Sequence, residues 1–496
     1  MMNPDRDSLI HLAKELARHY QSIEDYRVIL ADAGMAQESI HFDARAFFSW
    51  LYIFKACQQQ GAFVALFERV LEDYGDDVFG QALSLNWAYD RLGPMIDNLI
   101  KREELAWQNV LDKLFAKETL AVDDMSPSAL LVAKYEVVPF IFRQEELASL
   151  MAWCERPNPL ALRLYHGVGG LGKTRLLLEL MNQLSSKDWL KGFVKLAEAK
   201  TLLEDWDLLL SLDKPMLLVI DYAENQLEAL EGFLESAYKQ KHLKQLHHLR
   251  IVLLARNAGE WWEKLCEASK EQSSWLLASE VIELSAVADS LEQRQRLFQA
   301  AVFNFAKHLD QPPPQELHPD LSAKHFERAL LILMDALLAL DPYRQRSERD
   351  MESLLADVLS FERGYWRKQL KGKGIKDVET KALLDGLQAA LALCALGREL
   401  KDVDEAVDCL KEDRNFEGKS YAELKSLVEV LNAAYREPER YIGTIQPDLL
   451  AEYLVFKVWQ QAPKPLLARA FIEERARATQ HRSAAFESFV PVAARR

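Results

Sequence analysis

The sequence lacks the long apolar runs that membrane and secreted proteins carry. No stretch reaches the roughly 18 consecutive apolar residues that a membrane-spanning helix needs. The N-terminus also lacks the apolar core of a secretory signal peptide, because Asp5, Arg6 and Asp7 precede an amphipathic stretch. We therefore expect a cytoplasmic protein with no membrane partner.

Cysteine is scarce as well. The chain has five cysteines, an odd number, and no two of them form a CxxC pair. A disulfide framework or a zinc site would need paired or clustered ligands at recognisable spacing. The pattern therefore predicts reduced and mostly buried thiols.

The charge balance lacks a basic excess. The chain carries 61 Lys and Arg against 76 Asp and Glu, which gives a formal net charge of -15 at pH 7. A surface of that sign argues against a broad nucleic-acid or anionic-membrane contact. We therefore expect a protein or small-molecule partner and no nucleic acid.

Glycine and proline are few, and this favours helices. The chain has 19 Gly and 17 Pro, with 49% apolar and 28% charged residues, which is the balance of a helix-rich globular protein. Its 496 residues exceed one ordinary core, since domains contain roughly 100–200 residues. We expect a multidomain, mostly α-helical protein.

Residues 1–118 show apolar side chains at helical spacing, such as Leu9, Leu12 and Leu16. We predict a compact helical bundle, then a connecting helix from about Leu83 that is interrupted near Gly93-Pro94. The polar residues 119–130 are predicted to be a linker.

From Leu160 the pattern changes to short apolar runs separated by helical segments, which is typical of a parallel sheet with crossover helices. We predict an α/β domain over residues 131–288. The expected strands are Leu160–Tyr165, Phe193–Leu196, Met216–Ile220, Ile251–Ala255 and Val281–Leu284.

After about Asp289 the chain becomes helical again, and no fixed-period repeat is present. We divide this part into domains at 289–375 and 376–462 and a tail at 463–496. The expected helices are Leu291–His308, His325–Leu340, Met351–Leu370, Lys381–Leu396 and a segment around Leu449–Gln460.

The segment from Gly167 to Thr174 fits the Walker A pattern of a P-loop. Its glycines let backbone N–H groups face phosphates, its lysine reaches the β and γ oxygens, and its hydroxyl ligates Mg²⁺. An apolar strand leads in and a helix leads out, so the helix dipole favours the anionic phosphates. The residues predicted to bind ATP or ADP here are Gly167, Gly169, Gly170, Leu171, Gly172, Lys173, Thr174 and Arg175.

The apolar strand that ends at Asp221 fits Walker B, whose acid holds the Mg²⁺ shell. Thr174 and Asp221 are therefore the predicted metal-side residues. Glu224 follows three residues later and is a candidate to polarise the attacking water. A solvated, helix-capping glutamate is the alternative.

Arg256 follows the apolar strand Ile251–Ala255, at the tip where a neighbouring strand would face the γ-phosphate. A positive charge there would distinguish ATP from ADP. The alternative is an arginine that pairs with a nearby acid. We name Asp221, Glu224 and Arg256 as the candidate catalytic residues.

Together, four segments resemble bacterial signal-transduction ATPases with numerous domains, the STAND NTPases. They are Val138-Pro-Phe-Ile-Phe-Arg143, the Walker A loop, Leu218-Val-Ile-Asp-Tyr-Ala-Glu224 and Leu253-Leu-Ala-Arg256-Asn-Ala-Gly-Glu-Trp-Trp. The likeness extends to Leu354–Trp366 and to Gln446–Val455, so it covers roughly residues 130–460. It implies a helical domain after the NTPase domain and then a winged-helix-like domain.

The N-terminal residues resemble a bacterial effector-associated domain, a death-like helical adaptor. The likeness rests on Tyr26-Arg-Val-Ile-Leu-Ala-Asp-Ala-Gly-Met and Arg45-Ala-Phe-Phe-Ser-Trp. Such domains pair with a like domain on a second polypeptide that carries the effector.

The STAND resemblance implies further site residues and shows departures. Val138 to Arg143 would line the adenine and ribose side, and Arg256 would be the sensor arginine. The family usually has Gly where this chain has Phe142. The proline expected in the nucleotide-capping helix is not evident, and the usual acidic pair of Walker B is replaced by Asp221-Tyr222.

The resemblance implies a switch. ADP would hold the domains closed, and ATP would release a homo-oligomer that recruits an effector, in bacterial defence. Hydrolysis would be slow. The rival readings are an ATP-stabilised adaptor with negligible hydrolysis and a STAND-type transcriptional regulator. Since sensing in this family usually belongs to C-terminal repeats, either the protein senses through a partner or the chain is truncated.

Overall fold

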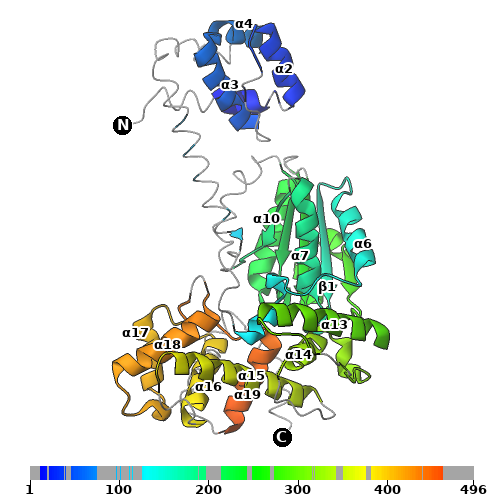
Figure 1. Cartoon of the computed structure of the whole chain (residues 1–496). Coiled ribbons are helices and arrows are strands. Elements are labelled where there is room, and N and C mark those ends of the chain that lie inside the picture. Colours follow the sequence, from blue (N-terminus) through cyan, green and yellow to red (C-terminus); the bar gives the residue numbers. More distant parts are fainter. Residues whose placement is uncertain are drawn as a thin grey trace.

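The computed structural model describes three parts of the chain. They are residues 12–74 except 19, 21, 38–39 and 41–45; isolated positions at 97, 101, 105, 111, 114 and 115; and residues 126–461 except 188, 197–213, 243–247, 269–272, 315–316, 318, 342–349, 376–380 and 438–439. Figure 1 shows these parts in three groups, with the N-terminal helices at one end, the sheet in the middle and the C-terminal helices at the other end.

The N-terminal helices pack around Trp50. Residues 12–18 are helical, and they are followed by α2 (Ile23–Asp32), α3 (Ala46–Gln60) and α4 (Phe63–Tyr74). Ser22 and Asp25 form a capping box that starts α2. Trp50 is fully buried against the rings of Tyr20, Tyr26 and Phe54. The helix expected from Leu83 and its break at Gly93-Pro94 lie outside the described residues.

The described strands form one parallel sheet. They are β1 (Leu160–His166), β2 (Leu190–Phe193), β3 (Met216–Ile220), β4 (Leu249–Ala255) and β5 (Glu280–Glu283). The sheet order is β2-β3-β4-β1-β5, and every pairing is parallel. The carboxyl ends of β1, β3 and β4 therefore meet at one edge, with β4 between the other two.

Alternate side chains of the strands enter cores on the two faces of the sheet, as the period of two requires. Leu217 and Val219 face the core formed with α6 (Gln144–Cys154) and α7 (Lys173–Leu184). Leu218 and Ile220 face the core formed with α10 (Leu227–His242), α11 (Glu260–Ala268) and α12 (Ser273–Leu277). The continuous apolar sequence of β3 follows from this burial on both faces.

The C-terminal helices share a third core. They are α13 (Leu291–His308), α14 (Ala329–Leu338), α15 (Met351–Gly372), α16 (Lys381–Ala395), α17 (Val403–Lys411), α18 (Tyr421–Tyr435) and α19 (Asp448–Gln461). Short 3-10 turns lie at η2 (Pro127–Leu131), η3 (Ala133–Tyr135), η4 (Ser185–Lys187), η5 (Ala223–Asn225), η6 (Lys324–Glu327) and η7 (Arg414–Phe416). Inside this core the buried carboxylate of Glu362 accepts hydrogen bonds from the Ser128 backbone N–H and from the Tyr435 hydroxyl, the latter at 2.6 Å.

The predicted fold class is confirmed: the protein is mostly helical, with a central α/β P-loop domain built on a parallel sheet. The division into domains and the winged-helix-like assignment stay predictions. Among the described residues, no helix combines the length and the apolar character that crossing a bilayer requires.

Several local features differ from expectation. The single helix expected at His325–Leu340 is divided into η6 and α14, because Arg328 between them is extended. The second strand was expected at Phe193–Leu196, but β2 begins and ends earlier, at Leu190–Phe193. It is an edge strand of half-buried residues, so its sequence carries little apolar signal. The end of the predicted linker is also structured, because η2 is buried beneath α14 and α15.

Candidate functional site

The P-loop joins β1 to α7 at the carboxyl edge of the sheet. Gly170 and Gly172 have φ of 86° and 87°, values that favour glycine. A Cβ on Gly170 would lie 2.9 Å from Cβ of Leu330, whereas one on Gly169 would meet no atom within 4 Å. The loop is therefore tightly packed behind Gly170 and open at Gly169.

Lys173 begins α7 and folds back over the loop. Its Nζ donates to the backbone oxygens of Gly167, at 2.5 Å, and Val168, at 3.3 Å. Burial lowers the pKa of Lys173, and the nearby carboxylates of Asp221 and Glu224 oppose that shift. A phosphate oxygen is a stronger acceptor than a backbone carbonyl, so an anion in this loop would take over these donors.

The Walker B acid lies beside the Walker A hydroxyl. The Thr174 Oγ1 donates to Asp221 Oδ2 at 3.1 Å, and the Tyr222 backbone N–H donates to Asp221 Oδ1 at 2.9 Å. Burial raises the pKa of Asp221 to about 6. No cluster of three or more His, Cys, Asp or Glu able to hold a metal occurs in the described residues. A hydroxyl with one carboxylate nevertheless fits the partial shell that Mg²⁺ takes when substrate phosphates and water complete it.

Glu224 and Arg256 lie together at the tips of β3 and β4. The Arg256 backbone N–H donates to Glu224 Oε1 at 2.9 Å, while Oε2 of Glu224 is buried and has no hydrogen-bond partner. Burial raises the pKa of Glu224. Glu224 as a whole is half-buried, and it does not belong to the wall of the cavity described below, nor do the predicted residues Gly167 and Leu171.

The Arg256 guanidinium forms an ion pair with Glu452, which lies in the second turn of α19. The arginine side chain is 25% exposed and that of the glutamate 9%. The sequence left two readings of Arg256 open, a phosphate contact or an ion pair, and in this structure it makes the ion pair.

Arg143 occupies the N-cap position of α6 and is 2% exposed. Its Nη2 donates to the backbone oxygens of Leu171, at 2.9 Å, and Ser285, at 2.7 Å. The side chain therefore fixes the P-loop to the end of β5. The preceding residue, Phe142, has φ of 67°, so the chain adopts the left-handed turn even though the residue is not glycine.

Arg175, the last of the predicted nucleotide contacts, is held by two carboxylates. It pairs with Glu136 at 3.2 Å and with Glu179 at 3.3 Å, and its guanidinium lies 5.4 Å from the ring centre of Phe140. These contacts join α7 to the segment before α6.

A cavity of about 1000 Å³ connects these groups. Its wall includes the predicted residues Val138, Arg143, Gly169, Gly170, Gly172, Lys173, Thr174, Arg175, Asp221 and Arg256. Mostly apolar residues between 130 and 141, with Lys134 and Glu136 among them, form one side, and the beginnings of α14 and α19 close the cavity. A volume of this size suits a nucleotide, and the apolar side suits a base.

The wall also contains residues that were not predicted, among them Tyr222, Leu330, Asp448 and Glu452. The backbone N–H of Leu330 donates to the Gly170 oxygen at 3.1 Å, and the Tyr222 hydroxyl donates to Asp448. The resembling segment Gln446–Val455 contains both acids one helical turn apart, but no sequence signal linked it to the P-loop.

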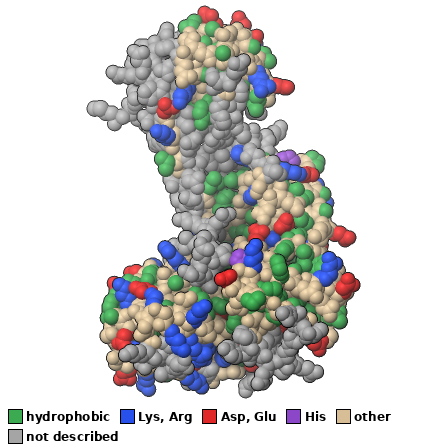
Figure 2. Space-filling model, viewed as in Figure 1, with side chains coloured by type: hydrophobic (Ala, Val, Ile, Leu, Met, Phe, Trp, Pro, Cys, Tyr) green, Lys and Arg blue, Asp and Glu red, His purple; other side chains and the backbone are tan. Residues whose placement is uncertain are grey.

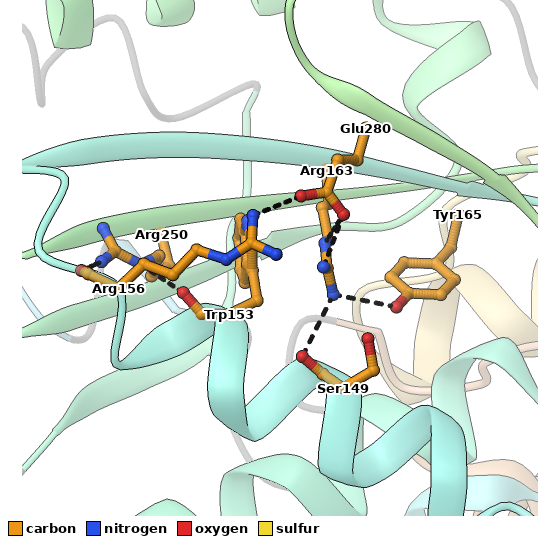
Figure 3. A network of polar contacts seen from close by, with 7 residues as sticks. All are labelled: Ser149, Trp153, Arg156, Arg163, Tyr165, Arg250 and Glu280. Carbon is orange, nitrogen blue, oxygen red and sulfur yellow. Dashed lines mark hydrogen bonds and ion pairs between the residues drawn. The ribbon is translucent and has the colours of Figure 1, made fainter.

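A second group of buried charges lies at the opposite edge of the sheet (Figure 3). The guanidinium groups of Arg163 and Arg250 lie 5.0 and 5.7 Å from the ring centre of Trp153. Arg250 donates to backbone oxygens at the end of α6, among them those of Cys154 at 3.0 Å and Asn158 at 2.7 Å. Arg163 pairs with Glu280 at 2.5 Å. All these donors have acceptors, which is the pattern of a structural anchor.

Comparison with known proteins gives similarity at the level of the fold. No protein-family model and no curated protein matches this chain. The ORC2 protein of Aeropyrum pernix, in ADPNP–ADP complexes, is 12% identical over 67% of this chain and 98% of its own, with a TM-score of 0.33. The ORC1 protein of the same organism, in complex with DNA, is 16% identical over 69% and 97%, with a TM-score of 0.32. The replication initiator DnaA, bound to AMPPCP and single-stranded DNA, is 12% identical over 68% and 98%, with a TM-score of 0.28.

These similarities are weak, so the assignment of a P-loop NTPase domain rests on the loop, the strand order and the Walker B strand described above. The death-like assignment of the N-terminal helices and the STAND class stay predictions.

The prediction that nucleic acid is not a partner is contradicted, because the similar ORC1 and DnaA structures contain DNA. The prediction relied on net charge, which averages over the whole surface, whereas nucleic acid responds to local groups of cations. Figure 2 shows Lys and Arg side chains, with Asp and Glu among them, over the end of the molecule formed by α16, α17 and α18. Net charge is therefore no ground for excluding DNA.

Proposed function

We propose that this chain is a nucleotide-controlled switch that binds ADP or ATP with Mg²⁺ at its P-loop and changes assembly state on exchange. One observation carries the proposal: a single cavity is walled by the P-loop, by the start of α14 and by the start of α19. A ligand in it touches the NTPase domain and the C-terminal helices at once. A ligand shifts a conformational equilibrium only through such differential contacts.

Three polar contacts join the P-loop and the strand tips to the C-terminal helices, beside the apolar packing of Val137 and Val287 against the C-terminal core. Leu330 donates to Gly170, Arg256 pairs with Glu452, and Tyr222 donates to Asp448. Each contact uses a group of the P-loop or of a strand tip, where phosphates would bind. Exchange of the nucleotide would therefore act directly on the groups that hold the C-terminal helices in place.

The residues present fit a magnesium nucleotide. Lys173 and the P-loop N–H groups would hold phosphate oxygens, and Thr174 and Asp221 would hold the metal. Residues 130–141 would enclose the base. When bound, Mg²⁺ neutralises charge on the phosphates. Glu224, with its unpartnered Oε2, would accept a proton from the attacking water.

A second candidate function is an ATP-stabilised adaptor with negligible hydrolysis. The ion pair between Arg256 and Glu452 favours it, because an arginine held by a carboxylate does not stabilise charge on a phosphate. Slow turnover in the closed arrangement is common to both candidates. They differ in whether Glu224 contributes to the rate.

Effector recruitment through the N-terminal helices is the downstream part of the proposal, and bacterial defence is its proposed setting. Both come from the resemblance. Among the described residues, α2 and α4 expose the apolar side chains of Ile23, Val28 and Val64. Clustering several such domains would raise the avidity for a multivalent effector.

Light scattering of the full chain tests the switch. We expect a small species with ADP, a larger one with a non-hydrolysable ATP analogue, and no change for Lys173→Ala with either nucleotide. Lys187→Ala is the matched control, because Lys187 forms an exposed ion pair with Glu155. If the mass of the wild type ignores both nucleotides, the proposal is wrong. Assembly on DNA without nucleotide would instead favour a transcriptional regulator.

A further inference from the structure

Two carboxylates of α19 point at the phosphate end of the cavity. We call Asp448 and Glu452 the α19 acidic pair. They lie one helical turn apart and so share one face of the helix. Both belong to the wall of the cavity that contains Lys173 and Asp221. This pair comes from the C-terminal part of the chain, 226 and 196 residues from the strand-tip residues that it contacts.

The pair engages both strand tips. Asp448 accepts from the Tyr222 hydroxyl, next to the Walker B acid. Glu452, which is buried, pairs with the Arg256 guanidinium. The Arg256 backbone is itself fixed, since its N–H donates to Glu224. The arginine that follows the central strand β4 is thus already neutralised by a carboxylate.

The pair also makes this end of the cavity crowded with negative charge. Burial, together with the neighbouring Asp221 and Glu452, raises the pKa of Asp448 to about 6. Like charges held close together oppose any further anion. A nucleoside triphosphate carries one more phosphate than a diphosphate, and that phosphate would extend toward Arg256 and this pair.

We propose that Asp448 and Glu452 make the closed chain selective for nucleoside diphosphate, because they repel a γ-phosphate and occupy the arginine that would bind it. The inference rests on the proposed nucleotide site and adds the residues that discriminate between its two ligands. A γ-phosphate binds only after it displaces Glu452 from Arg256. That displacement removes one of the two polar contacts described between α19 and the strand tips, the other being the hydrogen bond from Tyr222 to Asp448.

Equilibrium binding of Mg-ADP and of a non-hydrolysable Mg-ATP analogue to the full chain tests the proposal. The quantity of interest is the ratio of the two dissociation constants, analogue over ADP. We expect the wild type to favour ADP. Glu452→Gln keeps the shape of the side chain but removes its charge, so it should lower the ratio about tenfold, and Asp448→Asn should lower it severalfold.

Two further variants separate this effect from a general loosening. Glu429→Gln removes a carboxylate of α18 that pairs with Lys373 at 2.6 Å, away from the cavity, and should leave the ratio unchanged. The variant Arg256→Ala has no arginine for Glu452→Gln to release. Adding Glu452→Gln to this variant should therefore lower the ratio of dissociation constants less than it does in the wild-type background.

The possible outcomes are distinct. If both nucleotides bind and neither Glu452→Gln nor Asp448→Asn changes the ratio, the inference is wrong while the nucleotide site stands. If neither nucleotide binds the wild type, the proposed function itself is wrong. Should Glu452→Gln fail to fold, as judged by its melting temperature, Asp448→Asn decides the question alone.

Discussion

Strand β4 carries an arginine at each end, and the two are held in opposite ways. Arg250, near the start, is fully buried and donates to backbone oxygens of the same domain. Arg256, just after the end, is one-quarter exposed and pairs with a carboxylate of α19. A backbone carbonyl is a fixed acceptor, whereas a carboxylate on a separate helix is replaced by any better-placed anion. The first arginine is an anchor and the second an exchangeable contact.

The sheet shows the same difference between the amino ends and the carboxyl ends of its strands. At the edge of Arg163 and Arg250 every guanidinium nitrogen of both side chains has an acceptor. At the other edge Glu224 Oε2 has no partner, and Asp221 and Asp448 each have a pKa of about 6. The unpartnered carboxylate oxygen and the raised carboxyl pKa values lie where a ligand is expected to act, whereas the buried guanidinium groups at the structural end are fully paired.

Removing the anchor should have the largest effect. Arg250→Met would leave several buried backbone oxygens at the end of α6 without donors, so we expect a loss of about 3–5 kcal/mol of unfolding free energy. Chemical denaturation of the full chain measures it. Arg156→Met is the matched control: its ion pair with Glu280 is exposed, at 52% and 39%, and should cost under about 1 kcal/mol. Equal losses in the two variants would erase the distinction between the edges.

Removing the P-loop cation comes next. Lys173→Ala should weaken ADP binding about 100-fold, because the variant loses charge-assisted hydrogen bonds to the phosphates, while the unfolding free energy stays near that of the wild type. Titration calorimetry measures both nucleotides, with Lys187→Ala as the control. An unchanged dissociation constant for Lys173→Ala would mean that nucleotide does not bind at this loop.

The catalytic claim predicts a smaller change. Glu224→Gln keeps an oxygen for the Arg256 N–H but cannot accept a proton, so single-turnover hydrolysis should fall roughly 10- to 100-fold. Rapid-quench measurement with excess protein reports the chemical step. Equal, near-zero rates in wild type and variant would leave only the adaptor function.

The smallest effect concerns a thiol beside the anchor. Burial raises the pKa of Cys154 to about 12, so the native wild type should react little with a thiol reagent at pH 8 over minutes. In Arg250→Met the end of α6 should open more often, and labelling of Cys154 should speed up severalfold. Mass spectrometry of peptides locates the label. Equally fast labelling of Cys154 in the wild type would show that the anchor does not hold the end of α6.

Much of the fold was predictable because its signals are local. β3 was expected at its observed bounds, Met216–Ile220, because its five residues are apolar and buried on both faces. α13 was also expected at its observed bounds, Leu291–His308, where Ser290 and Gln293 form a capping box. β2 was misplaced, since a half-buried edge strand with Lys191 and Gly192 has no comparable signal.

The site also contains residues that local motifs predict and residues that only long-range contacts reveal. The P-loop, Asp221 and Arg256 follow from short motifs, and the structure places them around one cavity. The α19 acidic pair was missed because its contacts cross 196 and 226 residues. Whether Arg256 faces a phosphate or an acid depends on that distant helix, so no local pattern could decide it.

The central claim is that α19 closes over the phosphate end of the site with diphosphate and leaves it with triphosphate. The distance between probes attached at Glu235 on α10 and Asp408 on α17, both exposed, measures this directly in the full chain. We expect one short distance with Mg-ADP and a longer one with a non-hydrolysable Mg-ATP analogue. In Glu452→Gln the longer distance should appear at a lower concentration of the analogue. Identical distance distributions with the two saturating nucleotides would contradict the account.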